Sequence, residues 1–363
     1  VSMLSAVGER LYMKRDFPKK VYSGCWPNGH CQGIAVDKQG GYMYFSFTTA
    51  LVKTDLEGNV IGSAIGLLAH LGCIAFFDED GCVYGSLEYK NDEIGRGIEA
   101  RMGSRNEHDD AFYIARFDVS KIDRVGMDVF ADGVMTACYL KEVVDDYKAV
   151  LPDGIKHHLG CSGIDGLTFA PLYGAQRDSR KYLYVAYGVY GDVNRQDNDY
   201  QVILCYDVDD IKRFAQPLDQ DAPHHVGIDK PYQKLFAYTG NTTYGVQNME
   251  YDPTTGNVLL AVYVGKKPQF PNLPMYVLDG HVAPVECELR GVGERGLVLT
   301  LAKVGEEHPS GVNGLKFEYG STGIYALGNG EYYFSHDVQE GKESWSSTAY
   351  LYRADNKEGF VLA

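Results

Sequence analysis

HCQGIAV at residues 30–36 is the first of five related segments that lie far apart in the chain. The others are HLGCIAF at 70–76, GIDGLTF at 163–169, GVQNMEY at 245–251 and GVNGLKF at 311–317. Each segment passes through glycine or a small polar residue into a short apolar stretch, as a buried β-strand does after a turn. Self-similar β segments repeated along a chain are typical of propeller blades, so we expect each copy to be the innermost strand of a blade.

Two more patterns return in the same order after these segments. One is a strand centred on a small residue: YFS at 44–46, YGS at 84–86, YVA at 184–186, LLA at 259–261 and YFS at 333–335. The other is a strand that runs into an aspartate: Asp55, Asp118, Asp207, Asp279 and Asp355. Three patterns in a fixed order, repeated five times, predict an all-β, five-bladed propeller that spans residues 1–363 as a single domain.

The spacing of the repeats predicts where the blades begin and where the chain carries insertions. The inner strands are expected to begin at residues 32, 72, 165, 247 and 313, with insertions at 90–111 and 132–160. A helix is expected at 139–150, and outer strands near 60–65, 128–130, 234–238 and 296–301. Residues 10–17 and 21–22 have strand character before the first blade begins. We therefore expect this N-terminal strand to pair with the last blade and close the ring.

Composition excludes several classes of partner. The formal net charge of −15 repels phosphate backbones and anionic lipid surfaces, so neither nucleic acid nor a membrane is an expected partner. The longest apolar stretch, at 61–77, is interrupted by polar residues and too short for a membrane span. The eight cysteines include no CxxC pair, and most are expected to be buried thiols. Cys25 and Cys31 can form a disulfide if the protein is exported, and a secreted or periplasmic location is slightly favoured over a cytoplasmic one.

The loops that enter the innermost strands of a propeller open on one face, around the central axis. The five blades place Gln32, Gly72, Asp165, Gln247 and Asn313 at this position. The four polar members can coordinate a hard cation through carboxylate and amide oxygens, or they can hold ordered water in a structural channel. Gln32, Asp165, Gln247 and Asn313 are therefore candidate metal ligands, with Ca²⁺ as the candidate cofactor.

The loops that leave the second strands open on the same face, and two of them carry the carboxylates Glu88 and Asp337. With Asp165 they predict two or three carboxyl groups in one pocket, the arrangement that acid and base catalysis on a glycosidic bond needs. The alternative is a set of exposed loop charges that never meet. Further candidate proton carriers in these loops are His30, His70, His336 and Tyr263. For His30 and His70 the alternative is a structural, hydrogen-bonded imidazole.

Aromatic and basic residues in the loops of this face are candidate substrate contacts. Aromatic rings can stack on sugar planes, and a basic rim can bind an anionic substrate such as a uronate or a phosphate. The alternative is ordinary surface decoration by charged residues. The candidates are Trp26, Tyr190, Tyr244, Lys90, Arg195, Lys266 and Trp345.

The segments QGIAVD at 32–37 and YMYFSFTTALVKTDLEGNVIG at 42–62 resemble the blades of NHL and SMP-30 propellers. The number of blades is similar to that of arabinanase-type glycosidases and calcium-dependent apyrases. The resemblance covers nearly the whole chain, but no catalytic motif of these families matches. Arabinanase-like enzymes carry an axial aspartate in the first blade, where this chain has Gln32, and the apyrase calcium ring is largely glutamate and serine.

The leading functional hypothesis is a carbohydrate-active enzyme that cleaves a glycosidic bond in an axial pocket, by hydrolysis or by a lyase reaction. Its ligand would be a small molecule or an oligosaccharide. One alternative is a non-catalytic propeller that binds a glycan or a peptide, and another is a calcium-dependent phosphohydrolase. The chain contains no P-loop, no GxGxxG between a strand and a helix, no HExxH and no GxSxG motif, so those chemistries lack support.

Overall fold

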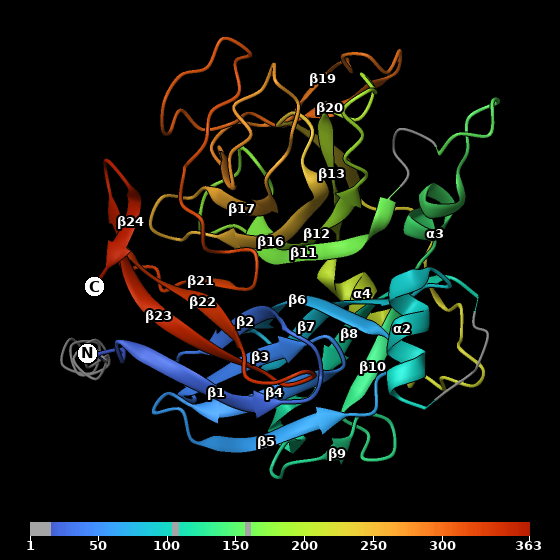
Figure 1. Cartoon of the computed structure of the whole chain (residues 1–363), viewed down its shortest axis with the longest axis vertical. Helices are drawn as coiled ribbons and strands as arrows, with labels where there is room; N and C mark the ends of the chain where they lie inside the picture. The colour runs from blue at the N-terminus through green and yellow to red at the C-terminus, as the bar shows by residue number, and fades with distance from the viewer. Residues whose placement is uncertain (1–15, 104–108, 157–160) are drawn as a thin grey trace, which may run out of the picture.

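A computed structural model describes residues 16–103, 109–156 and 161–363 as five β-sheets arranged around a central axis (Figure 1). The innermost strands contact one another in a ring, in the order of the blades. The five-bladed, all-β propeller predicted from the repeats is therefore confirmed. No helix among these residues is long and apolar enough to cross a bilayer.

The first two blades have four antiparallel strands each, and a short parallel strand extends each of them at the outer edge. From the axis outward, the first blade is β2 (Cys31–Asp37), β3 (Tyr42–Phe47), β4 (Ala50–Asp55), β5 (Val60–Ile65) and β9 (Met127–Asp128). The second is β6 (His70–Phe77), β7 (Cys82–Tyr89), β8 (Ala111–Phe117), β10 (Met135–Leu140) and β14 (Gly227–Ile228).

The remaining blades differ in width. The third is β11 (Cys161–Pro171), β12 (Lys181–Val189), β13 (Tyr200–Tyr206), β15 (Gln233–Tyr238), β20 (Arg295–Val298) and β19 (Val285–Glu288). The fourth is β16 (Thr243–Tyr251), β17 (Val258–Tyr263) and β18 (Met275–Leu278). The fifth is β21 (Ile324–Ala326), β22 (Glu331–Gln339) and β23 (Trp345–Asp355), with β24 (Gly359–Leu362) and β1 (Lys20–Trp26) both paired to β23.

Strand β1 closes the ring as predicted, because it pairs antiparallel with β23 from Lys20 opposite Tyr350 to Trp26 opposite Trp345. The part of the predicted N-terminal strand before residue 16 lies outside the described residues. Cys25 on β1 is exposed while Cys31 on β2 is buried, and both are free thiols, so the disulfide that the sequence allows is not formed in this structure.

Apolar clusters lie between neighbouring blades rather than along the axis. In the part of the chain that the structure describes, five buried clusters each join two adjacent blades. Aromatic side chains such as Tyr84, Phe77 and Phe169 pack edge-to-face or stacked between the second and third blades. This packing leaves the ends of the inner strands free to form pockets at both ends of the axis.

The helices lie in the connections between strands: α2 (Glu93–Arg101), α3 (Lys141–Lys148), α4 (Val208–Phe214) and the 3₁₀ turn η1 (Val119–Lys121). Asp92 caps α2 by accepting a hydrogen bond of 2.9 Å from the Gly95 N–H, and this helix occupies the predicted insertion at 90–111. The helix expected at 139–150 begins only at Lys141, because the residues before it form the outer strand β10.

The structure places the fifth inner strand at β21, not at 311–317 as predicted. Leu315 instead forms an isolated bridge with Met275 on β18, so this segment covers the open edge of the narrow fourth blade. Two outer strands also join different blades from those expected: β9 pairs with β5 of the first blade, and β20 pairs with β15 of the third. The repeat pattern identifies strand-forming segments, whereas the choice of neighbour depends on which sheet edge needs cover.

Candidate active site

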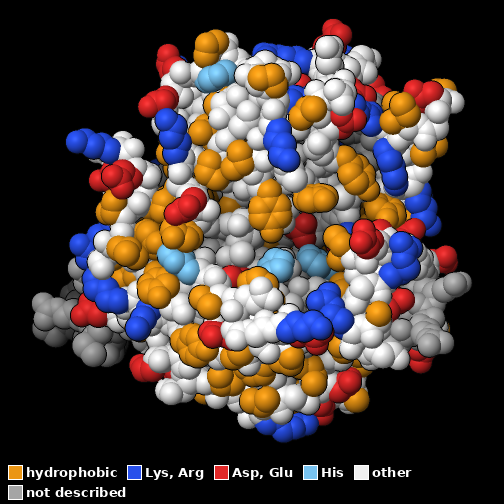
Figure 2. All heavy atoms as spheres, in the orientation of Figure 1, with side chains coloured by type: hydrophobic (Ala, Val, Ile, Leu, Met, Phe, Trp, Pro, Cys, Tyr) orange, Lys and Arg blue, Asp and Glu red, His pale blue; other side chains and the backbone are white. Residues whose placement is uncertain are grey.

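The candidate active site lies where the inner strands begin. Gln32 on β2, Asp165 on β11 and Gln247 on β16 lie at the positions predicted for an axial ring. Figure 2 shows histidine and carboxylate side chains close together near the middle of the face that this view presents, where the surface is hollowed. Next to Gln247, the Asn248 Nδ2 donates hydrogen bonds of 2.9 Å to the carbonyls of Gln32 and Ser321. Asn248 thereby ties the inner ends of three blades together.

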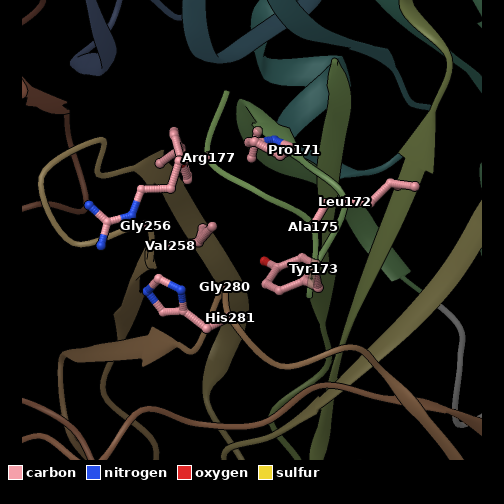
Figure 3. Close-up of a pocket in the computed structure, with 11 residues that line it drawn as sticks. Pro171, Leu172, Tyr173, Ala175, Arg177, Gly256, Val258, Gly280 and His281 are labelled. Carbon is pink, nitrogen blue, oxygen red and sulfur yellow. The ribbon is translucent and has the colours of Figure 1, made fainter. Parts of the chain in front are cut away.

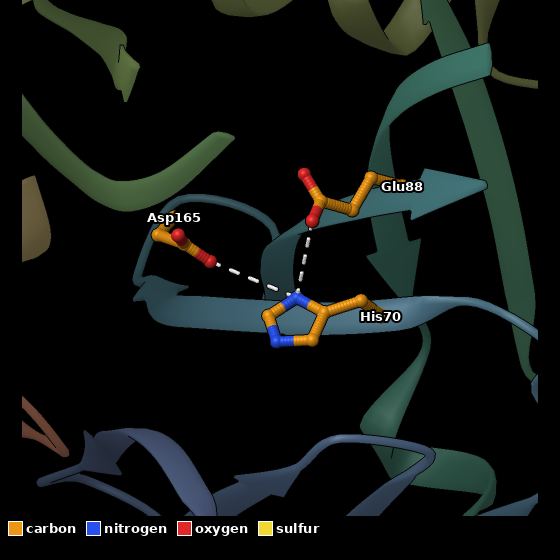
Figure 4. Close-up of side chains that lie close together, drawn as sticks. All are labelled: His70, Glu88 and Asp165. Atoms are coloured by element: carbon orange, nitrogen blue, oxygen red, sulfur yellow. Dashed lines mark ion pairs between the residues drawn. The ribbon is translucent and has the colours of Figure 1, made fainter. Parts of the chain in front are cut away.

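His70, Glu88 and Asp165 form a cluster across the second and third blades (Figure 4). His70 on β6 lies directly opposite Glu88 on β7, and the neighbouring strand β11 supplies Asp165. The His70 Nδ1 is 3.6 Å from both Glu88 Oε1 and Asp165 Oδ1, too far for a good hydrogen bond. Among the described residues, the buried His70 Nδ1 and Asp165 Oδ1 have no hydrogen-bond partner. Unsatisfied buried groups of this kind mark a place where a ligand or a transferred proton can be accommodated.

Glu88, in contrast, has partners for both carboxylate oxygens. Its Oε1 lies 2.9 Å from the Lys90 Nζ, and its Oε2 accepts a hydrogen bond of 2.8 Å from the Ile164 N–H. Residue 163 must be glycine here, because a Cβ atom on Gly163 would lie 2.1 Å from Glu88 Oε2. Glu88 is 3% exposed and is held as the counter-charge of Lys90.

The Lys90 ammonium is also fully engaged. It donates a hydrogen bond of 2.6 Å to the Ser162 carbonyl and lies 3.3 Å from Asp92 Oδ2, in addition to its contact with Glu88. Burial alone would lower the pKa of Lys90, but the Glu88 and Asp92 carboxylates outweigh it and raise that pKa above its ordinary value. Sequence reasoning missed this role, although residues 88 and 90 share one face of an extended chain and could have been recognised as a pair.

The groups of this cluster differ in their protonation state at neutral pH. Burial and the Glu88 charge raise the pKa of Asp165 to about 8, with the Lys90 charge opposing them, so this carboxyl is protonated at neutral pH. Burial, followed by the charge of Lys90, lowers the pKa of His70 to about 3 and keeps the imidazole neutral. Burial raises the pKa of Glu88 as well, against the charge of Lys90. We assign the shared proton to Asp165 because Glu88 has two strong donors and the Asp165 Oδ1 has none.

A second titratable group lies at the junction of the first and fifth blades. Asp337 Oδ2 accepts a hydrogen bond of 2.8 Å from the Cys31 N–H and lies 3.9 Å from the His30 Nδ1. Its Oδ1 is buried without a hydrogen-bond partner within the described residues. Burial raises the pKa of Asp337 to about 6, although the Ser347 side chain, the Cys31 N–H and the His30 charge oppose the shift. Asp337 is therefore largely ionised at neutral pH, in contrast to Asp165.

Tyr263 connects the two halves of the site. It ends β17, is partly exposed, and its pKa is raised first by burial and then by the charges of Asp165 and Asp337. On the other side, the His30 Nε2 is 3.2 Å from the Gln32 Nε2, which also donates to Thr48 Oγ1. The structure thus brings six of the seven predicted proton carriers to one mouth of the propeller: Glu88, Asp165, Asp337, His30, His70 and Tyr263.

His336 is the exception among the predicted proton carriers. Adjacent residues of a strand point to opposite faces, so on β22 His336 points away from Asp337. Its ring stacks on Tyr319 with centroids 3.7 Å apart, and its Nε2 lies 2.9 Å from the Tyr352 hydroxyl. Burial lowers the pKa of His336, so it is a neutral ring in an aromatic cluster, and its role as a base stays a prediction.

Asn313 also lies elsewhere than predicted. It belongs to the segment that covers the fourth blade, and Thr322 occupies the corresponding place before β21. The Thr322 hydroxyl contacts the Ser335 hydroxyl at 2.7 Å. The predicted metal set of Gln32, Asp165, Gln247 and Asn313 is therefore not assembled as one ring.

Most residues of the predicted basic rim already bind groups within the protein. Arg195 makes two hydrogen bonds of 2.8 Å to Asp197 and a third of 2.7 Å to the Lys156 carbonyl. Of the other candidates, Lys90 is buried against Glu88, and only Lys266 is exposed. The structure thus leaves little free positive charge among the predicted contacts, because these cations neutralise carboxylates that folding buries.

The predicted aromatic contacts lie around the mouth with different degrees of exposure. Trp345 packs its ring edge-to-face on His30 at 5.8 Å, and Trp26 faces Trp345 across the β1–β23 pair. Tyr190 is half-buried, and its pKa is raised first by burial and, to a smaller degree, by the charge of Glu88. Tyr244 is 53% exposed and has a positive φ of 59°. Trp345 thus contacts His30, and Tyr190 lies within electrostatic range of Glu88.

The donor atoms of His70, Glu88 and Asp165 all lie within 4.8 Å of one another, so distance alone permits a cation there. Two observations weigh against the predicted Ca²⁺. Calcium prefers six to eight oxygen ligands, whereas this cluster supplies an imidazole and two carboxyl groups. The Lys90 ammonium already neutralises Glu88. Calcium at this site stays a prediction.

No family model matches the chain, and no curated protein matches it. Solved structures that are similar include the Dos1 propeller, with 10% identity over 92% of this chain, 58% of that chain and a TM-score of 0.34. A gluconolactonase from Xanthomonas campestris has 10% identity over 88% of this chain and 72% of its own, with a TM-score of 0.34. A GH43 β1,3-galactosidase has 12% identity over 91% of this chain and 92% of its own, with a TM-score of 0.41. Similarity at this level says nothing about the chemistry of the present chain.

Proposed function

We propose that the chain is a glycoside hydrolase that acts on a neutral sugar at the axial mouth, with Asp165 as the proton donor. The observation that carries this proposal is the state of Asp165. Its carboxyl group is protonated at neutral pH, and its Oδ1 has no hydrogen-bond partner among the described residues. A carboxylic acid held neutral by its surroundings is the group that a glycosidase uses to protonate the leaving oxygen.

Asp337 is the complementary base in this proposal. With a pKa of about 6 it is mostly ionised at neutral pH, and its Oδ1 has no hydrogen-bond partner within the described residues. As the bond between the anomeric carbon and the glycosidic oxygen breaks, that oxygen takes the proton of Asp165. A water molecule attacks the anomeric carbon and loses its proton to Asp337. Neutral His70 lies beside Asp165, His30 lies beside Asp337, and Tyr263 lies near both carboxyl groups.

Hydrolysis of a neutral sugar fits the site better than a lyase reaction on a uronide. A lyase needs a cation that neutralises the substrate carboxylate before a proton is removed next to it. Of the predicted basic contacts, Lys90 and Arg195 are committed to Glu88, Asp92 and Asp197, and Lys266 alone is exposed. The same lack of free positive charge disfavours a phosphorylated substrate.

A substrate screen tests the proposal directly. Purified protein is incubated with neutral aryl glycosides and oligosaccharides, with uronides and with nucleotides, each with and without EDTA. Hydrolysis of a neutral glycoside, unaffected by EDTA, is the expected result. Cleavage of uronides alone would favour the lyase, EDTA-sensitive nucleotide hydrolysis would favour the phosphohydrolase, and glycan binding without turnover would favour the non-catalytic propeller.

The pH dependence of kcat/KM follows from the two carboxyl groups. Activity is expected to rise as pH passes about 6, because Asp337 must lose its proton to act as a base. It is expected to fall as pH passes about 8, because Asp165 then loses the proton that it donates. Steady-state rates across this range measure both limbs. Activity that keeps rising as pH passes about 8 would exclude Asp165 as the acid.

A further inference from the structure

Several cavities lie away from the candidate active site, and two of them involve the inner strands. One lies between the third and fourth blades, with Tyr173 and His281 on either side of it (Figure 3). Its volume of about 10 Å³ admits a single water molecule at most. The other has a volume of about 280 Å³ and is lined by residues from the inner strands of all five blades.

This larger cavity, the distal pocket, lies at the other end of the inner strands that begin at the active site. Its walls include Ile34 on β2, Ile74 on β6, Phe169 on β11, Glu250 on β16 and Tyr325 on β21. Glu250 follows Gln247 by three residues on the same strand, which separates the two levels by roughly 10 Å. The distal pocket is therefore a site of its own.

Glu250 is the unusual residue of the distal pocket. It is only 9% exposed, and its Oε1 accepts a hydrogen bond of 2.9 Å from the Ala326 N–H. No other hydrogen bond to this carboxyl group occurs within the described residues, so its second oxygen is left for the cavity that it lines. Burial raises the pKa of Glu250 to about 8, with the Ala326 N–H opposing the shift. The carboxyl group is thus a hydrogen-bond donor at neutral pH.

Positively charged and donor groups face Glu250 from the other blades. Lys181 on β12 lines the cavity, and its charge acts on Glu250. Lys38 also lines it and donates to the Leu327 carbonyl at 3.2 Å, while the Tyr325 hydroxyl comes from β21.

Negative charge near the pocket is limited. Asp252 acts on Glu250, but its carboxylate is occupied by the Tyr332 and Thr255 hydroxyls. Asp78 is exposed where it lines the cavity, and Asp37 binds the Gly40 N–H. With Glu250 protonated, the groups that face the cavity interior are mainly donors.

We propose that the distal pocket binds a small organic acid through its carboxylate, with Lys181 as the counter-charge and Glu250 and Tyr325 as hydrogen-bond donors. Of the two lysines that line the cavity, Lys38 contacts the Leu327 carbonyl, and no partner of the Lys181 ammonium occurs among the described residues. One singly charged carboxylate matches that ammonium, whereas a phosphate dianion exceeds it. The apolar side chains of Ile34, Ile74 and Phe169 then contact the body of the acid. This site is independent of the proposed glycosidase activity.

Calorimetric titration of the full chain with acetate, benzoate and inorganic phosphate tests the proposal. Benzoate is expected to bind more tightly than acetate because it also fills the apolar part of the cavity, and phosphate is expected to bind weakest. Lys181→Met should weaken benzoate binding roughly 10- to 100-fold, the range for loss of a charge-assisted hydrogen bond. Lys316→Met, at an exposed lysine outside this cavity, should leave binding unchanged.

The conservative variant Glu250→Gln tests whether Glu250 acts as a hydrogen-bond donor. Wild-type binding should weaken as pH rises through about 8, when Glu250 becomes negative. Glu250→Gln keeps a donor and cannot ionise, so it should retain binding at neutral pH and lose that weakening. Thermal unfolding confirms that each variant is folded. Absence of carboxylate binding, tighter binding of phosphate, or a Lys181→Met variant with unchanged affinity would overturn the assignment.

Discussion

Asp165→Asn is expected to lower kcat for an unactivated glycoside by roughly 100- to 10,000-fold, the usual contribution of a general acid. The amide keeps the size of the side chain but cannot deliver a proton to the leaving oxygen. The loss should shrink for aryl glycosides whose phenol leaves without protonation. Steady-state rates on a matched pair of substrates measure this difference.

The control for this variant is a partly buried carboxyl group whose role is structural. Asp80 accepts hydrogen bonds from the Tyr84 hydroxyl and Arg116 at the β6–β7 turn, away from the candidate active site. Asp80→Asn should leave kcat nearly unchanged. If Asp165→Asn lowers the rate equally for good and poor leaving groups, Asp165 acts in some way other than as a proton donor.

Lys90→Met is expected to destabilise the fold by about 3–5 kcal/mol, the range for removing one partner of a buried ion pair. The Glu88 carboxylate would remain buried with only the Ile164 N–H as a strong donor. In this variant the pKa of Glu88 in the folded state should rise further above its unfolded value. The destabilisation should therefore be smallest at low pH, where Glu88 is protonated, and should grow as pH rises through that pKa.

Urea denaturation at several pH values measures the effect. The double variant Glu88→Gln with Lys90→Met should recover part of the stability, because no uncompensated charge is left. Lys141→Met is the matched control, since its pair with Asp145 is exposed and exposed pairs contribute little. A Lys90→Met variant as stable as the wild type at neutral pH would contradict the role given to Lys90.

The titratable residues of the site were predictable because the repeat aligns the blades. Once strands β2, β6 and β11 are recognised as equivalent, Gln32, Gly72 and Asp165 must lie at one end of the axis. The second strands end at that same end of the axis, which places Glu88 on β7 and Asp337 on β22 there as well, within the strands rather than in the loops after them. These inferences need only the alternation of a strand and the symmetry of the ring.

What each of these residues does was not predictable in the same way. Glu88 and Asp165 are both carboxyl groups near the axis, yet only Glu88 has a lysine and a backbone N–H as partners. Arg195 was predicted to belong to a basic rim, but its N–H groups donate to Asp197 and to the Lys156 carbonyl. The charge state of each group depends on the ion-pair and hydrogen-bond partners that it meets in the folded protein. A sequence pattern does not show these partners.

The amino-acid sequence by itself determined the number of blades, the closure of the ring by β1 and the end of the axis at which Asp165 lies, because these follow from short-range strand patterns. Only the tertiary structure decided that 311–317 covers the fourth blade and that the proton belongs on Asp165 rather than on Glu88. The physical reason is that a strand pattern is local, whereas sheet-edge cover, desolvation and ion pairing depend on neighbours that the chain acquires only when it folds.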